Sequence, residues 1–537
     1  MTTVSEIVIE LKKKLKIYFG GNKVLANVLA GDIIYKEFDS TLSTGINRGY
    51  IIIDDKESEI YYYENGIYKI DGEQRIRDIA QRVLGDKANR NNIAEVLSAV
   101  KNLGVRVKRN KLNKYPNLIN LKTNIYNIET KETIPHSMDY YFTTQLDIIY
   151  NKEAVCPKCL KFFSEVHKPE DIPIIQELFG YCLYQNYDYH YMYFFLGSGR
   201  NGKGTELRLL IAFLGEENIV GDSPQALSEE TFAPAHLFGK LADICGDIGS
   251  EPIKNSEILK KMTGGDLISA QRKFQHSFNF FNFAKPIWSS NTPPEIIDRS
   301  DGMWDRMIHI TFPNKFAKGG VGTDPKLDSK LQTPEELSGL LNWAIVGLER
   351  LIKNEKMSYS LTTDENMRQY DRKASPVLAF AQDCLETSDD ELFEFKTTVR
   401  TQHQKYCVKY SLTCCNEETF TKQLKNAIPS CDSTRRVGSA GNQRPVYYGI
   451  QLKTEHKNGE NEEPKTPKER ADSLTKNKTL DESFIPKDDK TKHIEDTLKK
   501  EAPKIDDTGN TIKRQYKTAE EIAENIRKQK NGVADNA

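Results

Sequence analysis

The sequence predicts an α/β protein whose central domain is built on a parallel sheet. Residues 189–196 (YHYMYFFL) form an apolar run of strand length, a glycine-rich segment follows at 197–205, and residues 207–214 place leucine and isoleucine at helical spacing. Further apolar runs at 241–247 and 284–291 each end in a polar residue. Strands that alternate with helices in this way are typical of a parallel sheet.

Length and composition divide the chain into four regions. At 537 residues it is too long for one ordinary domain, and 38% hydrophobic with 28% charged residues suits a protein with at least one sizeable core. The formal net charge is −1, so a site for a polyanion must be a local patch. We expect a small α+β region at 1–150, a helical lead-in with the main α/β domain at 151–356, a further domain at 357–452, and a charged, disordered tail at 453–537.

The N-terminal region shows a hairpin signal but no catalytic constellation. Strand-like runs at 59–63 and 67–70 flank an Asn-Gly turn, and a polar amphipathic stretch follows from Arg75 to about Leu103. Asp55 and Glu57 are two residues apart and could hold a metal from one strand face. They lie in a polar connection, however, so we interpret them as a solvated turn.

The nine cysteines are scattered, which is typical of reduced thiols in a cytosolic protein. One Cys-x-x-Cys pair, Cys156 and Cys159, has His167 as its only nearby third candidate, so a zinc site there would be incomplete. No apolar run reaches membrane-spanning length, and the first residues lack a signal-peptide cleavage site. We therefore expect no membrane partner and a cytoplasmic location, in a prokaryotic host cell or a virus-infected cell.

The glycine-rich segment predicts a phosphate-binding loop for ATP. Its glycines allow a tight turn that aims backbone N–H groups at phosphate oxygens, the following helix adds positive charge at its N-terminus, and Lys203 would reach the β- and γ-phosphates. We expect nucleotide contacts from Gly197, Gly199, Asn201, Gly202, Lys203, Gly204 and Thr205. The usual pattern has Ser or Thr directly after the lysine, where this chain has Gly204. Thr205 is then the expected Mg²⁺ hydroxyl, in an uncertain register.

Three downstream segments add catalytic candidates. Asp247 ends an apolar strand and could bind Mg²⁺ or polarise the attacking water, although Glu251 leaves the division of these roles open. Asn291 ends the next strand, where an amide can hold the lytic water or sense the γ-phosphate. Arg306 precedes an apolar strand and suits a finger inserted into a neighbour's nucleotide site.

A basic tip between two strand-like runs predicts a DNA-binding hairpin. Arg272 and Lys273 lie at the end of the run 268–274, before the run 278–283, and Phe274 and His276 beside them could stack on bases.

The order of these motifs resembles the superfamily-three helicases, and more closely the phage and plasmid primase-helicase family with its poxvirus relatives. The resemblance covers about residues 45–450. It implies an AAA+-like motor that works as a homo-hexamer on DNA, with Lys203 as the nucleotide-clamping lysine, Asp247 as the acid of the second motif, Lys273 as the hairpin contact, Asn291 as the sensor and Arg306 as the finger. Asp305 replaces the first of two arginines often found there, and Arg299 is a possible substitute. We recognise no primase domain, so a separate primase or polymerase partner is expected.

Residues 357–452 predict a winged-helix domain. Helical spacing at 376–385, 393–410 and 417–428 precedes two strands at 432–437 and 446–452. Three arginines on the expected wing would face phosphates, namely Arg435, Arg436 and Arg444. The alternative is a solvated hairpin that packs on the motor. In the tail, residues 518–529 could form a short helix.

Three functions remain open from the sequence. The favoured one is an ATP-dependent DNA helicase or translocase that replicates a virus, plasmid or integrated mobile element. The alternatives are a nucleotide-dependent origin-binding or assembly protein with little unwinding activity, and a metabolic kinase.

Overall fold

The computed structural model describes residues 4–20, 23–36, 49–316, 324–387, 392–410, 412, 414–437 and 443–453. These all belong to one structural unit, residues 1–457. The predicted tail beyond residue 453, with its possible helix at 518–529, lies outside the described residues. Within the described ranges, no helix is both long and apolar enough to cross a bilayer.

The N-terminal region is a small α+β structure. Its four-stranded sheet has the order β5-β4-β3-β6, formed by Ile67–Lys69, Ile60–Glu64, Tyr50–Ile53 and Val105–Val107. The predicted hairpin is β4–β5, where Asn65 and Gly66 both have positive φ. The predicted amphipathic stretch forms two helices, since Gly85 interrupts it with φ 54°. The helices of this region are α1 (Val4–Lys13), α2 (Leu15–Tyr18), α3 (Ala26–Lys36), α4 (Gly72–Leu84) and α5 (Arg90–Leu103), and a short ribbon joins β1 (Phe19–Gly20) to β2 (Lys23–Val24).

A lead-in segment connects this region to the main domain. It contains a three-stranded antiparallel sheet of β7 (Leu118–Asn120), β8 (Ile125–Asn127) and β9 (Glu132–Ile134), followed by helices α6 (Pro157–Val166) and α7 (Ile172–Leu183).

The main domain confirms the predicted parallel sheet. Its five strands have the order β11-β12-β15-β10-β16, and every neighbouring pair is parallel. The strands are β11 (Ile219–Val220), β12 (Ala242–Cys245), β15 (Lys285–Ser290), β10 (Met192–Leu196) and β16 (Met307–Thr311). Because all strands run in one direction, their carboxyl ends share one edge, which is where ligands bind in open α/β sheets.

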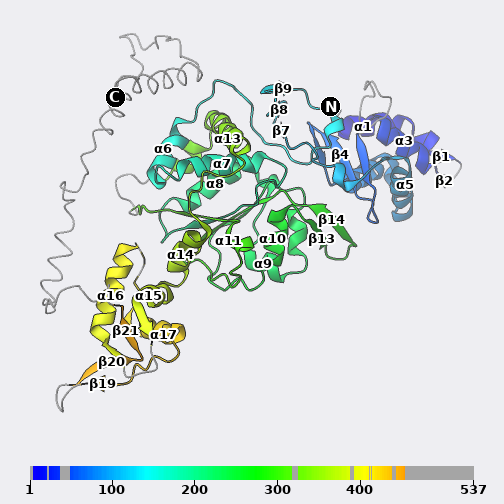
Figure 1. Ribbon diagram of the computed structural model, residues 1–537. Helices are drawn as coiled ribbons and strands as arrows, with labels where there is room; N and C mark the ends of the chain where they lie inside the picture. Colours follow the sequence, from blue (N-terminus) through cyan, green and yellow to red (C-terminus); the bar gives the residue numbers. More distant parts are fainter. Residues whose placement is uncertain are drawn as a thin grey trace, which may run out of the picture. The chain divides into compact units, whose positions relative to one another are not determined.

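Both faces of this sheet are covered, which explains why β10, β15 and β16 are buried along almost their whole length rather than on alternate residues. Tyr193 and Phe195 of β10 pack into one core with α6, α7, α8 and α13, whereas Phe194 and Leu196 pack into a second core with α10 and α11 (Figure 1). The remaining helices and strands of the domain are α8 (Lys203–Leu214), α9 (Pro224–Glu229), α10 (Glu257–Gly264), β13 (Leu267–Gln271), β14 (Ser277–Phe281), α11 (Asp301–Trp304), α12 (Leu327–Leu331) and α13 (Pro334–Asn354).

The C-terminal module combines short helices with two small antiparallel sheets, β17-β21 and β18-β20-β19. Its elements are α14 (Thr363–Ala374), α15 (Pro376–Cys384), β17 (Leu385–Thr387), β18 (Phe393–Phe395), α16 (Lys396–Lys409), α17 (Glu417–Ala427), β19 (Arg436–Val437), β20 (Arg444–Tyr448) and β21 (Ile450–Leu452). The helix predicted over 393–410 begins only at Lys396, because Phe393–Phe395 pairs with β20. The strand predicted over 446–452 is divided at Gly449, whose φ is 84°. Of the predicted wing loop, residues 438–442 lie outside the described residues.

Candidate nucleotide and nucleic-acid sites

The glycine-rich loop joins β10 to α8, in the strand–loop–helix context that the sequence predicts. Gly199 and Gly202 have φ of 86° and 97°, which side chains other than glycine rarely adopt. A Cβ on Gly197 would lie 2.0 Å from Asn201 Nδ2, so this position also requires glycine. The glycines are therefore needed for the backbone path itself.

Lys203 is the first residue of α8 and lies inside the loop. Its Nζ donates to the carbonyl oxygen of Gly197 and, at 3.1 Å, to Asn291 Oδ1. The residue is only 6% exposed, and this burial lowers its pKa although Asp247 acts in the opposite direction. Asn201 Nδ2 is buried in the same loop without a hydrogen-bond partner among the described residues. The loop thus holds a cation and a spare donor at the carboxyl edge of the sheet.

Asn291 connects Lys203 to Asp247. The amide accepts from the lysine through Oδ1 and donates through Nδ2 to Asp247 Oδ1 at 3.1 Å. These residues follow neighbouring strands, because Asn291 comes directly after β15 and Asp247 follows β12. The sheet order β12-β15-β10 therefore brings the three residues, which the sequence predicts as catalytic, to one place.

Thr205 is oriented away from this cluster. Its hydroxyl accepts from Arg208 Nη2 at 3.2 Å, and Arg208 Nε pairs with Asp328 of α12 at 2.7 Å. The exposed Gly204, which occupies the usual hydroxyl position, contributes no side chain. The structure does not bring Thr205 into the Lys203–Asn291–Asp247 cluster, so its predicted role as the Mg²⁺ hydroxyl stays a prediction.

Arg306 lies at the opposite edge of the sheet. Its carbonyl accepts from the N–H of Met192 at 2.7 Å, which places it beside the start of β10. The phosphate loop begins only after the five residues of β10, roughly 16 Å further along at about 3.3 Å per residue. The guanidinium donates from Nη1 to the carbonyl oxygen of Gly302, while Nε is buried and unpartnered within the described residues. Arg306 therefore faces away from the loop of its own chain.

The alternative finger residue, Arg299, is already engaged, and so is Asp305, which replaces an arginine of the motif. Arg299 pairs with Asp371 at 2.7 Å, and Asp305 accepts from the Thr363 hydroxyl.

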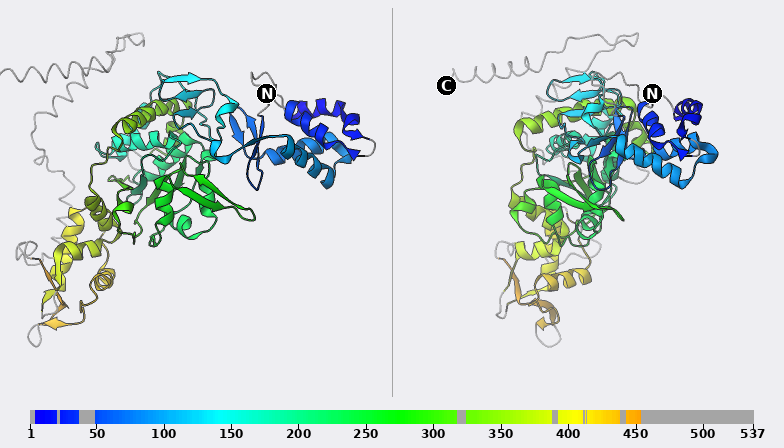
Figure 2. Two further views of the ribbon diagram at one scale, coloured as in Figure 1. Left: turned by 45° about the vertical axis from the view of Figure 1, so that its right-hand side comes forward. Right: turned by 90° about the vertical axis from the view of Figure 1, so that its right-hand side faces the viewer.

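The predicted hairpin is present, with shorter strands than the sequence indicates. The tip residues 272–276 connect β13 to β14, and Phe274 at the tip is 93% exposed with φ 65° (Figure 2). Lys273 Nζ lies 5.2 Å from the centroid of the Phe274 ring. Arg272 behaves differently, because its Nη1 is ion-paired with Glu59 of the N-terminal region. The two predicted DNA-binding cations are therefore not equivalent.

The acidic turn at 54–59 contacts the hairpin tip. Asp55 accepts the N–H groups of Glu57 and Ser58, as expected of a turn. The turn is only partly solvated, since Asp54 and Lys56 are exposed but Glu57 Oε1 accepts the N–H of His276 at 2.7 Å. Arg109 strengthens the arrangement by pairing with both Asp55 and Glu59. Sequence reasoning missed this contact because Glu59 and Arg272 are 213 positions apart and neither belongs to a motif.

A cavity of about 1040 Å³ adjoins the hairpin tip. Arg272 and Lys273 line it together with aromatic residues and further basic residues, which include Tyr62, Tyr68, Phe232, Lys69, His236 and Lys240. Basic and aromatic side chains are the combination that single-stranded nucleic acids contact.

The Cys-x-x-Cys pair is not part of a metal site in the described structure. His167 is paired with Glu206 at 2.6 Å, and both side chains are fully buried. Burial opposes protonation of His167, but the Glu206 carboxylate outweighs it and raises the pKa of the imidazole. Cys159 Sγ donates to the carbonyl oxygen of Leu331. His167 and Cys159 are thus occupied by separate core contacts.

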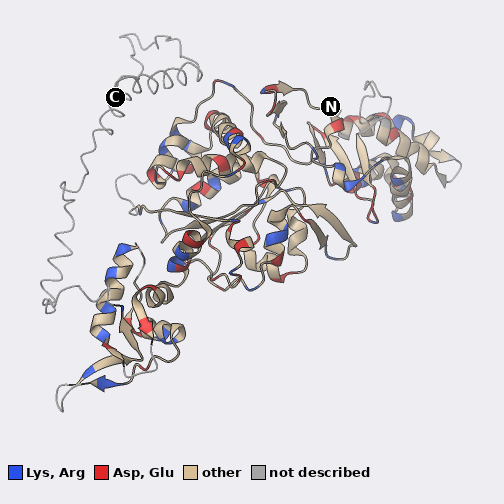
Figure 3. Ribbon diagram, viewed as in Figure 1, with Lys and Arg blue, Asp and Glu red and all other residues tan. Residues whose placement is uncertain are grey.

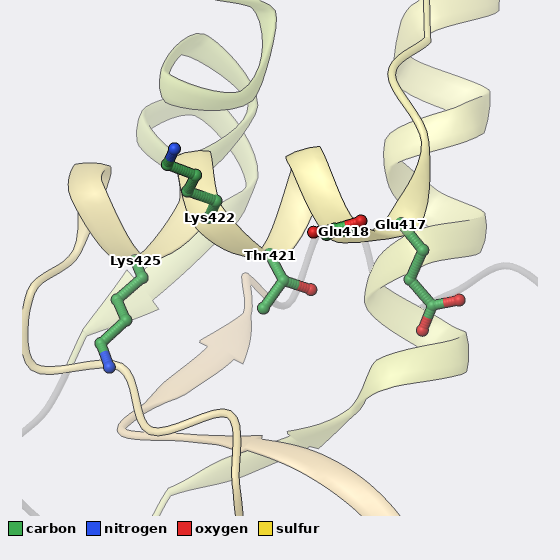
Figure 4. A pocket seen from close by; sticks show the side chains of 5 residues that line it. All are labelled: Glu417, Glu418, Thr421, Lys422 and Lys425. Carbon is green, nitrogen blue, oxygen red and sulfur yellow. The ribbon is translucent and has the colours of Figure 1, made fainter.

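The arginines of the C-terminal module are partly neutralised. Arg435 pairs with Asp432 at 3.0 Å and lies over the Tyr448 ring, whereas Arg436 and Arg444 are exposed on β19 and β20 (Figure 3). The exposed face of α17 carries both acidic and basic side chains. They surround a shallow hollow lined by Glu417, Glu418, Thr421, Lys422 and Lys425 (Figure 4). The predicted wing strands β19 and β20 therefore present exposed basic residues, whereas the exposed face of α17 is mixed in charge.

Comparisons with known proteins cover parts of the chain. Residues 195–306 match the profile of a family of unknown function (DUF5906), and residues 32–168 match the D5 N terminal like family. A protein of Acanthamoeba polyphaga mimivirus, whose name assigns it provisionally as a helicase, is 29% identical over 203 residues. The match covers 36% of this chain and 20% of that protein, so this chain spans about a fifth of its length.

Among solved structures, two apo forms of the NrS-1 C-terminal region are similar. One is 14% identical with a TM-score of 0.39 and covers 74% of this chain and 96% of that one. The other is 13% identical with a TM-score of 0.41 and covers 75% and 97%.

Proposed function

We propose that the chain is an ATP-dependent DNA helicase or translocase of the superfamily-three, primase-helicase type. The observation that carries the proposal is the hydrogen-bonded series Lys203–Asn291–Asp247 at the carboxyl edge of a parallel sheet, directly beside a glycine-rich loop. The mimivirus relative and the D5 N terminal like match support a role in the replication of a virus or related element.

In this proposal ATP binds on the loop. Lys203 exchanges its bond to the Gly197 carbonyl for the β- and γ-phosphates, and backbone N–H groups at the start of α8 face the same anion. Asn291 is placed to respond to the γ-phosphate, because its amide already joins the cation to the carboxylate.

The donors at this edge fit Mg²⁺, which prefers carboxylate and hydroxyl oxygens. Asp247 would hold the ion, and Thr205 would join it by releasing Arg208. When bound, Mg²⁺ neutralises charge on the transferring phosphate. Asp247 then positions the attacking water, with Glu251 as the alternative base.

DNA is proposed to bind at the hairpin. Lys273 supplies a phosphate contact and the exposed Phe274 ring supplies a stacking surface. The C-terminal module would act as a winged helix whose strands carry Arg436 and Arg444 to the duplex.

The position of Arg306 supports a ring. A guanidinium at the amino edge of the sheet serves the nucleotide of a neighbouring AAA+-like subunit rather than its own. We propose a homo-hexamer, assisted by a separate primase or polymerase, in the cytoplasm of a prokaryotic host or an infected cell.

A second candidate is a nucleotide-dependent origin-binding or assembly protein. The observation that favours it is the hydrogen bond from Arg208 to the Thr205 hydroxyl, because a hydroxyl held in this way does not bind Mg²⁺. A metabolic kinase has less support, because it explains neither the hairpin nor Arg306.

The test is ATP hydrolysis with and without single-stranded DNA, using Lys203→Ala and a matched control, Lys261→Ala, whose exposed lysine lies on α10. We expect DNA-stimulated turnover in wild type and control, and none in Lys203→Ala. Negligible turnover in the wild type would favour the assembly protein, and turnover that ignores DNA would favour the kinase. Normal hydrolysis by Lys203→Ala would exclude the assigned nucleotide site.

A further inference from the structure

Three soft ligands converge in the C-terminal module. His403 and Cys407 are one turn apart on α16, so they share a helix face. Cys414 comes from the segment between α16 and α17. One donor atom from each residue lies within 4.8 Å of the other two. Within the described part of the chain, no other group of three His, Cys, Asp or Glu donors meets this distance.

The distances match the edges of a tetrahedral coordination shell. Cys414 Sγ lies 3.7 Å and Cys407 Sγ 3.9 Å from His403 Nδ1, and Cys407 Sγ lies 3.5 Å from Nε2. Zn–S bonds of about 2.3 Å and Zn–N bonds of about 2.0 Å place tetrahedral ligands roughly 3.5–3.8 Å apart. A single thiol–imidazole hydrogen bond would account for one of these contacts but not for the convergence of all three.

The imidazole is held in place by aromatic packing. His403 is fully buried, and the rings of Phe420 and Phe380 lie 4.6 Å and 5.2 Å from it. Cys407 is also buried, whereas Cys414 is exposed and provides access from solvent. A rigid buried ligand pair with one accessible ligand is what an ion needs to enter and be held.

Arg400 completes the surroundings. Its Nη1 lies 3.1 Å from His403 Nδ1, and its Nη2 donates to the carbonyl oxygen of Cys415. A guanidinium beside two thiolates offsets their negative charge. Both sulfur atoms lie close to Nδ1, so coordination through this nitrogen requires Arg400 to release it.

We infer that His403, Cys407 and Cys414 bind a zinc ion, whose fourth ligand is a water. The ion would tie α16 to the segment that leads into α17, whose N-cap is Asn416. It thereby sets the angle between these two helices, independently of the nucleotide site. The Cys-x-x-Cys motif that the sequence offers for zinc is therefore the wrong pair, and the site lies in a pattern with wider spacing.

The test uses the full chain, purified under reducing conditions, and Zn²⁺ and Co²⁺ as probes. We expect the wild type to retain one zinc per chain, and the apo form to show the thiolate-to-cobalt absorption band when Co²⁺ is added. Cys414→Ser should lose both signals. Because Cys414 is exposed, this variant should keep its far-ultraviolet circular dichroism.

Cys431→Ser is the matched control, since Cys431 is a buried cysteine of the same module outside the cluster. It should retain the metal. Absence of zinc together with absence of a cobalt band in the wild type would overturn the inference. Unchanged metal binding by Cys414→Ser, or equal loss in Cys431→Ser with native circular dichroism, would also overturn it.

Discussion

The carboxyl edge of the sheet and the hairpin tip are assembled in different ways. At the edge, Lys203, Asn291 and Asp247 follow neighbouring strands, so the sheet order alone brings them together. At the tip, Arg272 meets Glu59 across 213 positions of sequence, through a contact between the main domain and the N-terminal region. Residues at the sheet edge can be predicted from the strands that they follow. Whether a basic residue at the hairpin tip is free or ion-paired depends instead on a partner that is distant in the sequence.

The largest loss of ATP hydrolysis is expected from substitution of Arg306, at the amino edge of the sheet. Arg306→Ala should lower hydrolysis by about 10³-fold or more while nucleotide still binds, because a finger neutralises transition-state charge in trans. Mixing it with Lys203→Ala under subunit exchange should restore part of the activity, since some interfaces then pair an intact loop with an intact finger. The measurement is ATPase rate against mixing ratio, with each variant doped into wild type as the control. Absence of rescue, with merely proportional loss on doping and a monomeric mass, would refute both the finger and the ring.

Thr205 is predicted to bind Mg²⁺ but lies outside the Lys203–Asn291–Asp247 cluster. If its hydroxyl leaves Arg208 to hold Mg²⁺, Thr205→Ala should slow hydrolysis on the order of 10²-fold, because metal positioning is worth several kcal/mol. Arg208→Ala is the control and should not slow hydrolysis, since it frees the same hydroxyl. A Thr205→Ala protein with normal Mg²⁺-dependent kinetics would remove Thr205 from the metal site.

The two basic residues of the hairpin tip, Lys273 and Arg272, should contribute unequally to DNA binding. Lys273→Ala should abolish DNA stimulation and unwinding but keep basal hydrolysis, whereas Arg272→Ala should have a smaller effect because Glu59 already neutralises Arg272. Glu59→Gln should release Arg272, tighten DNA binding and steepen the salt dependence by roughly one phosphate contact, about 0.9 in the log–log slope. Fluorescence anisotropy across a salt series measures this. Equal losses in Lys273→Ala and Arg272→Ala would show that the acidic turn does not neutralise Arg272.

The stability of the fold should depend on pH through Asp243, a buried residue within β12. Burial raises the pKa of this carboxyl from 3.8 to about 8, although the N–H of Asp222 and the Trp288 indole donate to it. The folded state therefore holds a proton that the unfolded state releases above about pH 4. The resulting stability is fully present below that pH and is lost as pH rises towards 8, by up to about 1.4 kcal/mol per pH unit.

Chemical denaturation of the wild type and Asp243→Asn between pH 5 and 8 measures this slope, with the range taken from the ordinary and raised pKa values. The Asn variant should show a flatter dependence. Equal slopes in the two proteins would mean that Asp243 is ionised in the fold.

Much of the central domain was predictable because its signals are local. The run 189–196 contains β10, Gly215 ends α8, and the strand ends delivered Asp247 and Asn291 as expected. The predicted boundaries of helices and strands were wrong where strand pairing determined them. Phe393–Phe395, for example, has helical spacing but pairs with β20 as a strand. The cluster of His403, Cys407 and Cys414 escaped prediction because its third ligand lies beyond the end of α16.

By itself the sequence determined the parallel α/β fold, the glycine-rich loop and the residues at its edge, because apolar periodicity and glycine positions act over a few residues. Only the tertiary structure decided that Arg272 is paired, that Thr205 is oriented towards Arg208, and that Arg306 is remote from its own loop. Those outcomes depend on which elements pack together. A charge or hydroxyl takes the nearest compatible partner in space, and the distance to that partner is not encoded by sequence separation.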